Sequence, residues 1–227
     1  MYKKKSIFIT FEGIEGSGKS YQSRKLYKKI KEMKLPAIYT REPGGTKGAE
    51  KIRELILKDY FDKNPKEKFS KNTDTLLYLA SRNEHIEKKI KPAIRSKKII
   101  ICDRFIDSTL AYQVYGKKVN KNLINHIHKH ILGNLRPNLT ILLIANISNA
   151  MNRLNKRKKK NRYDKFTKQF YNNVQKAFLK ISKENKQRFF VVDNTYDTIK
   201  TEKIIFNRFT QILKKWLIYE LPRTIKI

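Results

Sequence analysis

The sequence predicts an α/β protein in which helices cover both faces of a five-stranded parallel sheet. Two observations indicate this class: several short runs are apolar throughout, and segments with helical periodicity separate them along the chain. A strand without polar alternation belongs to a sheet that is covered on both faces, and alternating strands and helices are typical of parallel connections. At 227 residues, of which 39% are hydrophobic, the chain suits one domain with a substantial core.

The predicted strands are short runs rich in Ile, Leu, Val and Phe. They cover residues 6–11, 37–40, 99–102, 139–145 and 189–192. The predicted helices cover residues 19–33, 49–58, 73–91, 107–115, 121–132, 148–157, 165–186 and 198–217. Because proline cannot continue a helix, Pro36 and Pro92 are expected to end the first and the third helix. Residues 59–71 are expected to form a polar loop, and residues 218–227 a flexible tail after a single domain of residues 1–217.

The chain is strongly basic, with 53 Lys and Arg residues against 20 Asp and Glu residues and a formal net charge of +33. Such a charge attracts polyanions, so nucleic-acid binding has to be weighed. The lysines are spread over the whole length together with many Asn and Ile residues, and A/T-rich codons alone would produce this bias. We therefore expect no specific nucleic-acid partner. The densest cluster, residues 156–160, has another explanation below.

Neither a membrane segment nor a disulfide is expected. No apolar run approaches the ~20 residues of a membrane helix, and the run at 6–11 is shorter than the apolar segment of a signal peptide. The one cysteine, Cys102, can form no internal disulfide and no cysteine zinc site. The expected location is the cytoplasm.

A phosphate-binding loop follows the first predicted strand. Residues 13–20, GIEGSGKS, fit the pattern G-x-x-x-x-G-K-[ST]. The glycines let backbone N–H groups point at a triphosphate, Lys19 reaches the β- and γ-phosphates, and the Ser20 hydroxyl is a ligand of Mg²⁺. The helix that begins near Lys19 adds the positive end of its dipole. The predicted nucleotide-binding residues are Gly13, Ile14, Glu15, Gly16, Ser17, Gly18, Lys19 and Ser20.

A second polar strand end supports this site. Asp103 and Arg104 directly follow the apolar run at 99–102. Ligands of open α/β sheets bind at the carboxyl ends of the strands, and P-loop proteins place an aspartate near the metal there. Ser20 and Asp103 are therefore the predicted Mg²⁺ ligands, partly through water. The alternative is that Asp103 and Arg104 form a local surface ion pair.

Three histidines, His126, His128 and His130, lie in one predicted helix and suggest a metal site. On a helix only His126 and His130 share a face, and no acid or cysteine completes a ligand set. A solvated helix face is the preferred interpretation.

Four segments resemble the thymidylate kinase family in order and spacing: FEGIEGSGKS at 11–20, TREPGGT at 40–46, LLYLASR at 76–82 and DRFIDSTLAYQ at 103–113. The resemblance extends from about residue 6 to 215. It implies a P-loop NTPase fold of the nucleotide kinase type and transfer of the γ-phosphoryl group of ATP to dTMP, giving ADP and dTDP for dTTP synthesis. It further implies Mg²⁺ as the cofactor and a homodimer.

The resemblance also implies an acceptor site. An aromatic ring at Tyr78 stacks on thymine, and Arg82, four residues further along the same helix, donates to the O4 carbonyl. An arginine donates but cannot accept, so it disfavours the 4-amino group of cytosine. Gln113 faces the thymine edge, and Ser108 and Thr109 line the pocket. The alternatives are that Tyr78 belongs to the core and that the three polar residues are solvated.

Charged residues complete the implied acceptor site. Arg53 and Arg104 contact the acceptor phosphate, which suits guanidinium groups. Arg41 and Glu42 lie beside the acceptor and near the metal, and Glu15 binds the 3′-hydroxyl group. The alternative for Glu15 is an acid that complements the helix dipole.

Residues 150–164, AMNRLNKRKKKNRYD, resemble the lid that closes over ATP in this family. One branch of the family supplies a catalytic arginine from the P-loop. This chain has Gly16 at that position and resembles the other branch, in which lid arginines stabilise the transferring group. Arg153 and Arg157 are the predicted catalytic arginines of the lid, and Arg162 is a predicted ligand of the ATP phosphates. The predicted catalytic set is completed by Lys19, Asp103 and Arg104.

Two other functions stay open at this point. Another P-loop deoxynucleotide or deoxynucleoside kinase is the nearer alternative, although Arg53 and Arg104 favour a phosphorylated acceptor. A basic, ATP-dependent nucleic-acid-binding protein is the alternative from a different class. It predicts binding that weakens steeply with salt and a basic patch away from the phosphate loop.

Overall fold

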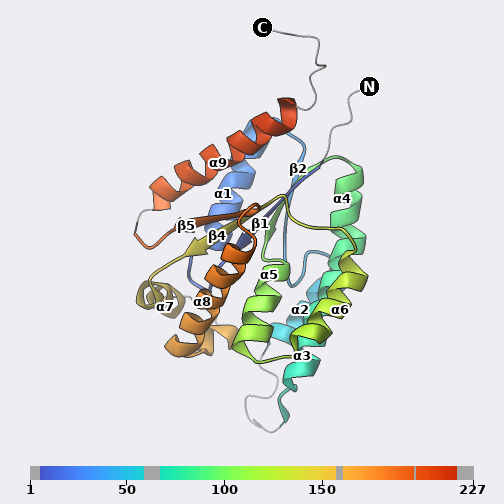
Figure 1. Cartoon of the computed structure of the whole chain (residues 1–227), viewed down its shortest axis with the longest axis vertical. Coiled ribbons are helices and arrows are strands. Elements are labelled where there is room, and N and C mark those ends of the chain that lie inside the picture. The colour runs from blue at the N-terminus through green and yellow to red at the C-terminus, as the bar shows by residue number, and fades with distance from the viewer. Residues whose placement is uncertain (1–5, 59–66, 157–160, 197, 219–227) are drawn as a thin grey trace.

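The computed structural model describes residues 6–58, 67–156, 161–196 and 198–218, with side chains up to Lys215. The predicted sheet is confirmed: five strands lie in the order β2-β3-β1-β4-β5, and each neighbouring pair is parallel (Figure 1). The strands are β1 (Ile7–Glu12), β2 (Ala37–Arg41), β3 (Ile99–Asp103), β4 (Leu139–Ile144) and β5 (Phe189–Asp193).

A helix is found at each predicted position. The α-helices are α1 (Lys19–Glu32), α2 (Lys47–Leu57), α3 (Lys71–His85), α4 (Lys91–Arg95), α5 (Ile106–Thr109), α6 (Lys121–Leu132), α7 (Ile147–Asn155), α8 (Lys168–Glu184) and α9 (Thr198–Ile218). Two π-helical segments and a 3₁₀ turn continue or join them: η2 (Ile86–Ile90), η3 (Leu110–Gly116) and η4 (Arg162–Lys165). Most of the predicted loop at 59–71 and of the predicted tail lies outside the described residues. No described helix combines the length and apolar composition that crossing a membrane requires.

The third predicted helix does not end at Pro92, so that prediction is wrong. α3 continues through the π turn of η2 into α4, which ends at Arg95. Pro92 lies in the first turn of α4, where backbone N–H groups have no partner within an α-helix, so its missing N–H removes no hydrogen bond of that helix. The chain turns away at Lys97, where φ is 54°.

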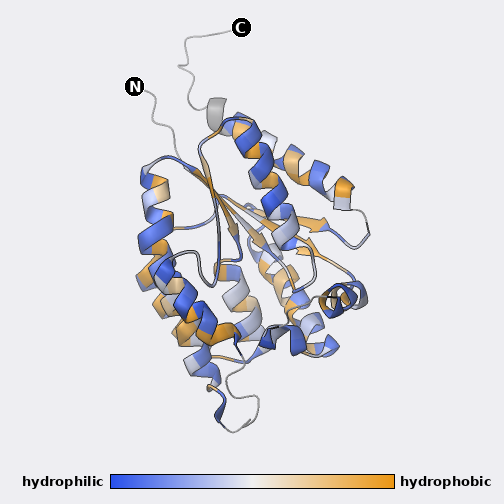
Figure 2. Cartoon of the chain, turned by 180° about the vertical axis from the view of Figure 1, so that it is seen from behind, coloured by the Kyte–Doolittle hydropathy of each residue, from blue (hydrophilic) through white to orange (hydrophobic). Residues whose placement is uncertain are grey.

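Helices cover both faces of the sheet, as predicted (Figures 1 and 2). On one face, α1 and α9 pack against alternate strand residues such as Ile9, Ile101 and Ile141. The other face presents the intervening residues, among them Phe8 and Ile100, to η2, α4 and α6. The strands therefore carry apolar residues on both sides, which Figure 2 shows as a hydrophobic centre between more polar helices.

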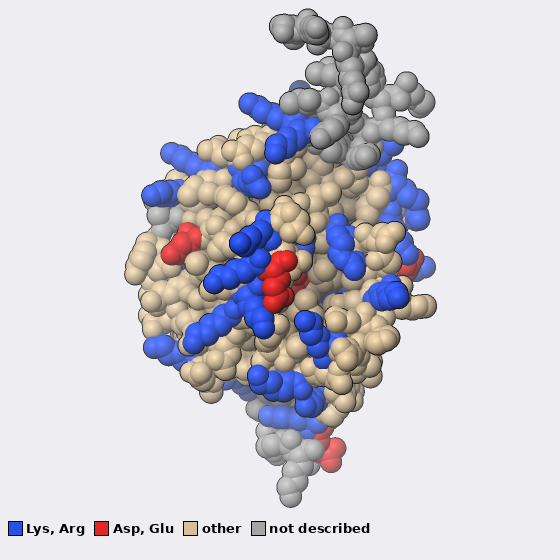
Figure 3. Space-filling view, viewed as in Figure 1, with Lys and Arg blue, Asp and Glu red and all other residues tan. Residues whose placement is uncertain are grey.

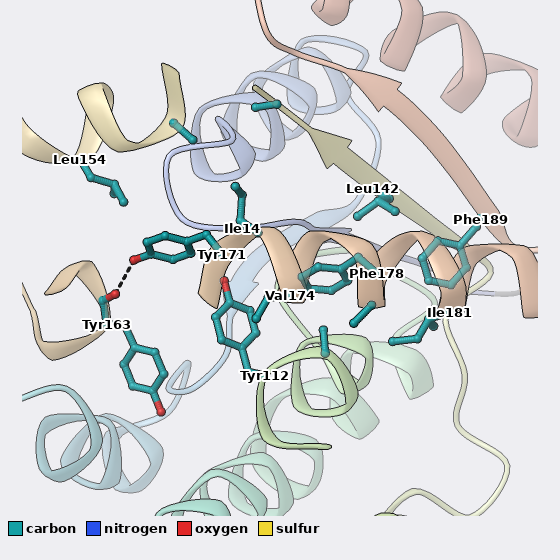
Figure 4. Close-up of a cluster of buried hydrophobic side chains, with 14 of the residues drawn as sticks. Ile14, Tyr112, Leu142, Leu154, Tyr163, Tyr171, Val174, Phe178, Ile181 and Phe189 are labelled. Carbon is teal, nitrogen blue, oxygen red and sulfur yellow. Dashed lines mark hydrogen bonds between the residues drawn. The ribbon is translucent and has the colours of Figure 1, made fainter. Parts of the chain in front are cut away.

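A further core cluster joins α8 to η3 and η4 (Figure 4). Tyr112 from η3 and Tyr163 from η4 pack with Tyr171 and Phe178 from α8. The Tyr171 hydroxyl donates to the backbone carbonyl of Tyr163. The last part of the predicted lid segment is therefore packed into the core.

The carboxyl ends of β1, β2 and β3 meet at one edge of the sheet. Asp103 lies beside Phe11 of β1 on one side and beside Arg41 of β2 on the other. Chain connections diverge to the two sides of β1, and open α/β sheets bind ligands at such a point. The phosphate loop leaves β1 at this edge and leads directly into α1.

Candidate active site

A cleft of about 950 Å³, including its open mouth, lies at this edge of the sheet. It brings together most of the predicted site residues: Glu15, Lys19, Ser20, Arg41, Glu42, Arg53, Tyr78, Arg82, Asp103, Arg104, Ser108, Thr109 and Gln113. Other lining residues received no role from the sequence, among them Arg24, Tyr39, Phe105, Tyr112 and Tyr163.

Lys19 lies in the first turn of α1 and lines the cleft. Its side chain is buried, and Nζ donates to the carbonyl oxygen of Ile14 over 2.5 Å. Burial, reinforced by the nearby Arg104 guanidinium, lowers the pKa of Lys19 to about 7. The Ile14 side chain is buried in the core, so Ile14 contributes only its backbone to the loop.

The three glycines of the phosphate loop, Gly13, Gly16 and Gly18, all have a positive φ that other residues rarely adopt. Gly18, which precedes α1, has a φ of 91°, and Gly16 has a φ of 74°. A Cβ atom at Gly16 would lie 2.2 Å from the carbonyl oxygen of Ala150 in α7. The loop therefore packs directly on the helix that begins the predicted lid, and position 16 has no room for a side chain.

Ser20 and Asp103 lie together, as the sequence predicts. The Ser20 hydroxyl donates to Oδ2 of Asp103, and Oδ1 of Asp103 is buried without a hydrogen-bond partner in the described part of the chain. These oxygens fit Mg²⁺, which takes few protein ligands and completes its shell with water and phosphate oxygens. Within residues 6–58, 67–156, 161–196 and 198–218, no group of three His, Cys, Asp or Glu side chains is placed to hold a metal ion.

Arg104 connects the phosphate loop to α5. Nη1 donates to the carbonyl oxygen of Gly13 (2.9 Å) and to the Ser108 hydroxyl (3.0 Å). Nη2 donates to Oε1 of Glu15 (2.8 Å). Burial acts to lower the pKa of Arg104, but the negative groups around it, chiefly Glu15, raise it, so the guanidinium stays charged.

Glu15 carries its charge inside the cleft wall. Burial alone would raise the pKa of Glu15, but the charges of Arg104 and Lys19 lower it below its ordinary value. The second carboxylate oxygen accepts a hydrogen bond from the Tyr112 hydroxyl. Tyr112 belongs to the segment at 103–113 that resembles the family, and its contact with Glu15 gives it a role in orienting this carboxylate.

Glu12, the last residue of β1, fixes the turn that follows β3. Oε1 accepts from the backbone N–H of Phe105 (2.8 Å), and Oε2 accepts from the Ser108 hydroxyl (2.6 Å). Burial, together with the nearby Asp107, raises the pKa of Glu12 to about 8. In the sequence, Glu12 is marked by its place as an acidic residue at the end of an apolar strand. Many residues without a role in a functional site have the same pattern, so the pattern alone does not identify this role.

Arg82, in α3, lines the cleft with 2% of its surface exposed. Nε donates to Oε2 of Glu42 (2.7 Å), and Nη2 donates to the carbonyl oxygen of Phe105 (3.0 Å). Nη1 lies 2.7 Å from Nε2 of His128. A guanidinium has five N–H groups, so these contacts leave one on each terminal nitrogen. Tyr78, one turn earlier on α3, lines the same cleft, as the shared face predicts.

Glu42 is a buried carboxylate between Arg82 and His85. Its Oε1 lies 3.0 Å from Nδ1 of His85, whose Nε2 lies 2.6 Å from the Thr40 hydroxyl. Burial alone would raise the pKa of Glu42, but the Arg82 guanidinium lowers it. Sequence reasoning assigned no role to His85, because its partners, Thr40 in β2 and Glu42 directly after β2, lie 45 and 43 positions away in the chain.

His128 is not part of a solvated histidine face, so that expectation is wrong for this residue. Its side chain is 7% exposed because α6 packs on α3 and turns position 128 inward. His126 and His130 are exposed, as expected. Periodicity separates position 128 from the other two histidines but cannot show which side of the helix faces the protein.

Gln113 lies in the cleft wall with 2% of its surface exposed. Its Nε2 is buried and has no hydrogen-bond partner within the described residues. Buried amide groups are nearly always hydrogen-bonded in folded proteins, so this nitrogen is a donor that a ligand in the cleft could use.

Arg41 and Arg53 line the cleft on the α2 side. Arg53 donates to the carbonyl oxygen of Pro43 (2.7 Å), and Arg41 forms an ion pair with Glu50 (3.0 Å). Their side chains are 26% and 43% exposed, respectively, so both guanidinium groups can reach an anion in the cleft.

Arg153, in α7, does not line the cleft. Its guanidinium donates to the backbone carbonyls of Gly16 (3.2 Å), Asn194 (3.2 Å) and Thr195 (2.8 Å). It therefore ties α7 to the phosphate loop and to the loop after β5. Its predicted catalytic role stays a prediction.

Arg162, in η4, forms an ion pair with Asp74 of α3 and does not line the cleft either. Asp74 is buried and also accepts from Nζ of Lys117 (2.6 Å) and from the Tyr163 hydroxyl (3.0 Å). The end of the lid segment is thus docked on the helix that carries Tyr78. Arg157 lies outside the described residues.

Comparisons with known proteins agree with this arrangement. The family profile described as Thymidylate kinase matches residues 11–205. A thymidylate kinase of Sulfurihydrogenibium sp. (strain YO3AOP1) is 38% identical over 205 residues, which cover 90% of this chain and 97% of that protein. A thymidylate kinase of Wolbachia sp. subsp. Brugia malayi (strain TRS) is 40% identical over 188 residues, which cover 82% of this chain and 86% of that protein. The crystal structure of thymidylate kinase from Ehrlichia chaffeensis matches with a TM-score of 0.69 and 31% identity, covering 92% of this chain and 99% of the other. The chain therefore belongs to the thymidylate kinase family.

Proposed function

We propose that the chain transfers the γ-phosphoryl group of ATP to dTMP, giving ADP and dTDP. The observation that carries this proposal is the single cleft into which both the phosphate loop with Lys19 and the pocket with Tyr78 and Arg82 open. Arg104 joins the two halves, because it donates to the loop at Gly13 and also lines the pocket. Family membership supports the same reaction.

Phosphoryl transfer requires a protein mainly to position two substrates and to neutralise their charges. An oxygen of the dTMP phosphate forms a bond to the γ-phosphorus, and the bond from that phosphorus to the β–γ bridging oxygen breaks. Lys19 neutralises the oxygens of the transferring group from the loop side. Arg53 and Arg104 neutralise the acceptor phosphate.

Ser20 and Asp103 would hold Mg²⁺, because Oδ1 of Asp103 is buried and unpartnered within the described part of the chain. When bound there, the metal ion supplies positive charge to the β- and γ-phosphate oxygens. Lys19, Ser20 and Asp103 all line the cleft, and Ser20 is hydrogen-bonded to Asp103. We also propose that the lid arginines supply additional positive charge near ATP; they are Arg153, Arg157 and Arg162.

The base of the acceptor is selected by the type of hydrogen bond that the pocket offers. Arg82 has two N–H groups left over, and the Nε2 of Gln113 is an unpartnered donor in the described structure. Thymine presents carbonyl oxygens to donors, whereas cytosine places an amino group at position 4. A buried donor facing a donor leaves both unpaired, at a cost of ~1–3 kcal/mol.

A coupled assay of ADP formation tests this function, with ATP, Mg²⁺ and each of dTMP, dUMP, dCMP, dAMP, dGMP and thymidine. The expected result is the highest kcat/KM for dTMP, with dCMP at least ~10-fold lower. Preferred use of thymidine would identify a nucleoside kinase instead. ATP hydrolysis that requires DNA and no acceptor would favour the nucleic-acid alternative.

We also propose a homodimer formed through α2, α3 and α6. These helices pack one beside the next, and each exposes a leucine: Leu55 (41% exposed), Leu76 (48%) and Leu123 (38%). Exposed apolar side chains on neighbouring elements support a protein interface. A cytoplasmic location belongs to the same proposal, because ATP and dTMP are cytoplasmic metabolites.

A further inference from the structure

The guanidinium of Arg82 is fixed in the cleft wall by three separate parts of the chain. Glu42, which directly follows β2, binds Nε, and the carbonyl oxygen of Phe105, after β3, binds Nη2. The third partner, His128, comes from α6 and lies 2.7 Å from Nη1. Because each nitrogen has its own partner, the plane of the guanidinium has a single orientation.

Among the described hydrogen-bond partners of the Arg82 side chain, His128 is the one that does not line the cleft. Glu42 and Phe105 both line the cleft, and His128 lies behind Arg82, 7% exposed. An arginine has no acceptor, so the short Nη1–Nε2 distance requires an unprotonated Nε2 on the imidazole. Burial, together with the charges of Arg82 and Arg136, lowers the pKa of His128 to about 2, so the ring is a neutral acceptor at every working pH.

We infer that His128 is a positioning residue for acceptor recognition: its imidazole accepts one N–H of Arg82 and thereby aims the remaining N–H groups at the pyrimidine. The inference rests on the proposed function, in which Arg82 donates to thymine O4. Without the acceptor at position 128, Nη1 has an unpaired N–H in a buried wall, and the guanidinium is free to tilt toward another acceptor. The expected effect is on recognition of the base, and ATP binding at the phosphate loop should be unchanged, because the described hydrogen bond of His128 is to Arg82.

Three variants separate positioning from packing. His128→Phe keeps the ring and removes the acceptor, and His128→Leu removes both. His128→Gln keeps an acceptor oxygen near the place of Nε2. His130→Leu, on the exposed side of the same helix, is the matched control. Thermal melting establishes that each variant is folded before its kinetics are measured.

The expected result for His128→Phe and His128→Leu is a KM for dTMP raised ~10-fold, an unchanged KM for ATP, and a dTMP/dCMP selectivity lowered ~10-fold. His128→Gln is expected to recover most of the KM and the selectivity, and His130→Leu to equal wild type. Wild-type selectivity in a folded His128→Phe or His128→Leu variant would overturn the inference. So would a failure of His128→Gln to differ from His128→Leu.

The same assays distinguish this inference from the proposed function. If the wild-type chain does not prefer dTMP, or if Arg82→Ala lowers the use of all monophosphates equally, the proposed role of Arg82 fails. If the wild type prefers dTMP and Arg82→Ala loses this preference while His128→Phe retains it, only the role of His128 fails.

Discussion

The ammonium group of Lys19 donates to a backbone carbonyl rather than to a carboxylate, so its charge stays available to a bound triphosphate. Lys19→Ala is therefore expected to lower kcat at least ~100-fold, equivalent to about 2.7 kcal/mol of barrier. The melting temperature should change little, because Lys19 is not a member of the three hydrophobic core clusters found among the described residues. Steady-state kinetics and a thermal melt measure both effects. A folded variant that keeps more than about a tenth of wild-type activity would contradict the assigned role.

The lowered pKa of Lys19 predicts proton uptake when ATP binds. In the free protein this pKa is about 7, and the negative charge of the triphosphate raises it in the complex. The affinity for ATP is therefore expected to be greatest below pH 7. Above pH 7 it should fall by up to ~10-fold per pH unit, until the pH reaches the pKa that Lys19 has in the complex. Calorimetric titration at pH 8 in two buffers of different ionisation enthalpy measures the uptake.

Lys19→Arg is the control for this titration, since an arginine keeps its proton at every working pH. When it binds ATP, this variant should take up fewer protons than wild type does, and the difference is the uptake by Lys19. Equal uptake in both proteins would assign the proton to ATP or to another side chain.

At the scale of residues, the sequence predicted the parts of the site that have a local pattern. Lys19 and Ser20 belong to a short loop motif, and Asp103 ends an apolar strand. Glu12 and His128 could not be assigned in this way. The partners of Glu12 lie 93 and 96 positions away in the chain, and those of His128 depend on which side of α6 packs on α3.

The helix α7 is the element through which the lid segment meets the phosphate loop. Arg153→Gln and Arg157→Gln are both expected to lower kcat, and the variant of the more important residue should lower it by ~10- to 1000-fold. The changes in the KM for ATP and in the KM for dTMP should be smaller. In Arg153→Gln the carbonyls of Gly16, Asn194 and Thr195 also lose donors, so this variant is expected to have the larger effect. Steady-state kinetics of both variants and of the double variant provide the measurement.

Lys156→Gln, at the exposed C-terminal end of α7, is the matched control for charge alone, and its kcat should equal that of wild type. A double variant of Arg153 and Arg157 with wild-type kcat would remove the lid arginines from the mechanism.

At the scale of elements, strand positions followed from the sequence because a strand buried on both faces must be apolar along its whole length. The end of the third helix did not follow. Pro92 forbids an α-helical interior, but a π turn places it in the first turn of a new helix, where it costs no hydrogen bond. Whether a chain inserts such a turn depends on how the helix packs, which local composition does not encode.

For the whole molecule, the leucines on α2, α3 and α6 predict a dimer that a single charge disrupts. Leu76→Glu introduces a carboxylate into the proposed apolar interface and is expected to shift the protein from dimer to monomer, with the fold retained. Ile199→Glu, at an exposed apolar position of α9, is the control and should stay dimeric. Light scattering coupled to size-exclusion chromatography measures the mass. A wild-type chain that is monomeric at tens of micromolar would refute the proposed interface.

The net charge of +33 has no single location on the face seen in Figure 3, where Lys and Arg side chains are spread among few acids. A dispersed charge produces attraction without a fixed binding geometry, and salt screens it. Its expected consequence is weak, salt-sensitive retention on polyanions, with no preferred sequence. Such a dispersed charge is also what codon bias would produce, and the even distribution of Lys, Asn and Ile along the chain suggests that origin.

The contact between Gly16 and Ala150 limits how such an enzyme could evolve. An arginine at position 16 would need a left-handed backbone and the space that the Ala150 carbonyl occupies, 2.2 Å from the site of its Cβ. Gaining a P-loop arginine therefore requires α7 to withdraw, and α7 carries Arg153. Under the role proposed for Arg153, a lineage that moves its catalytic arginine from the lid to the P-loop must therefore pass through an intermediate in which α7 has already shifted.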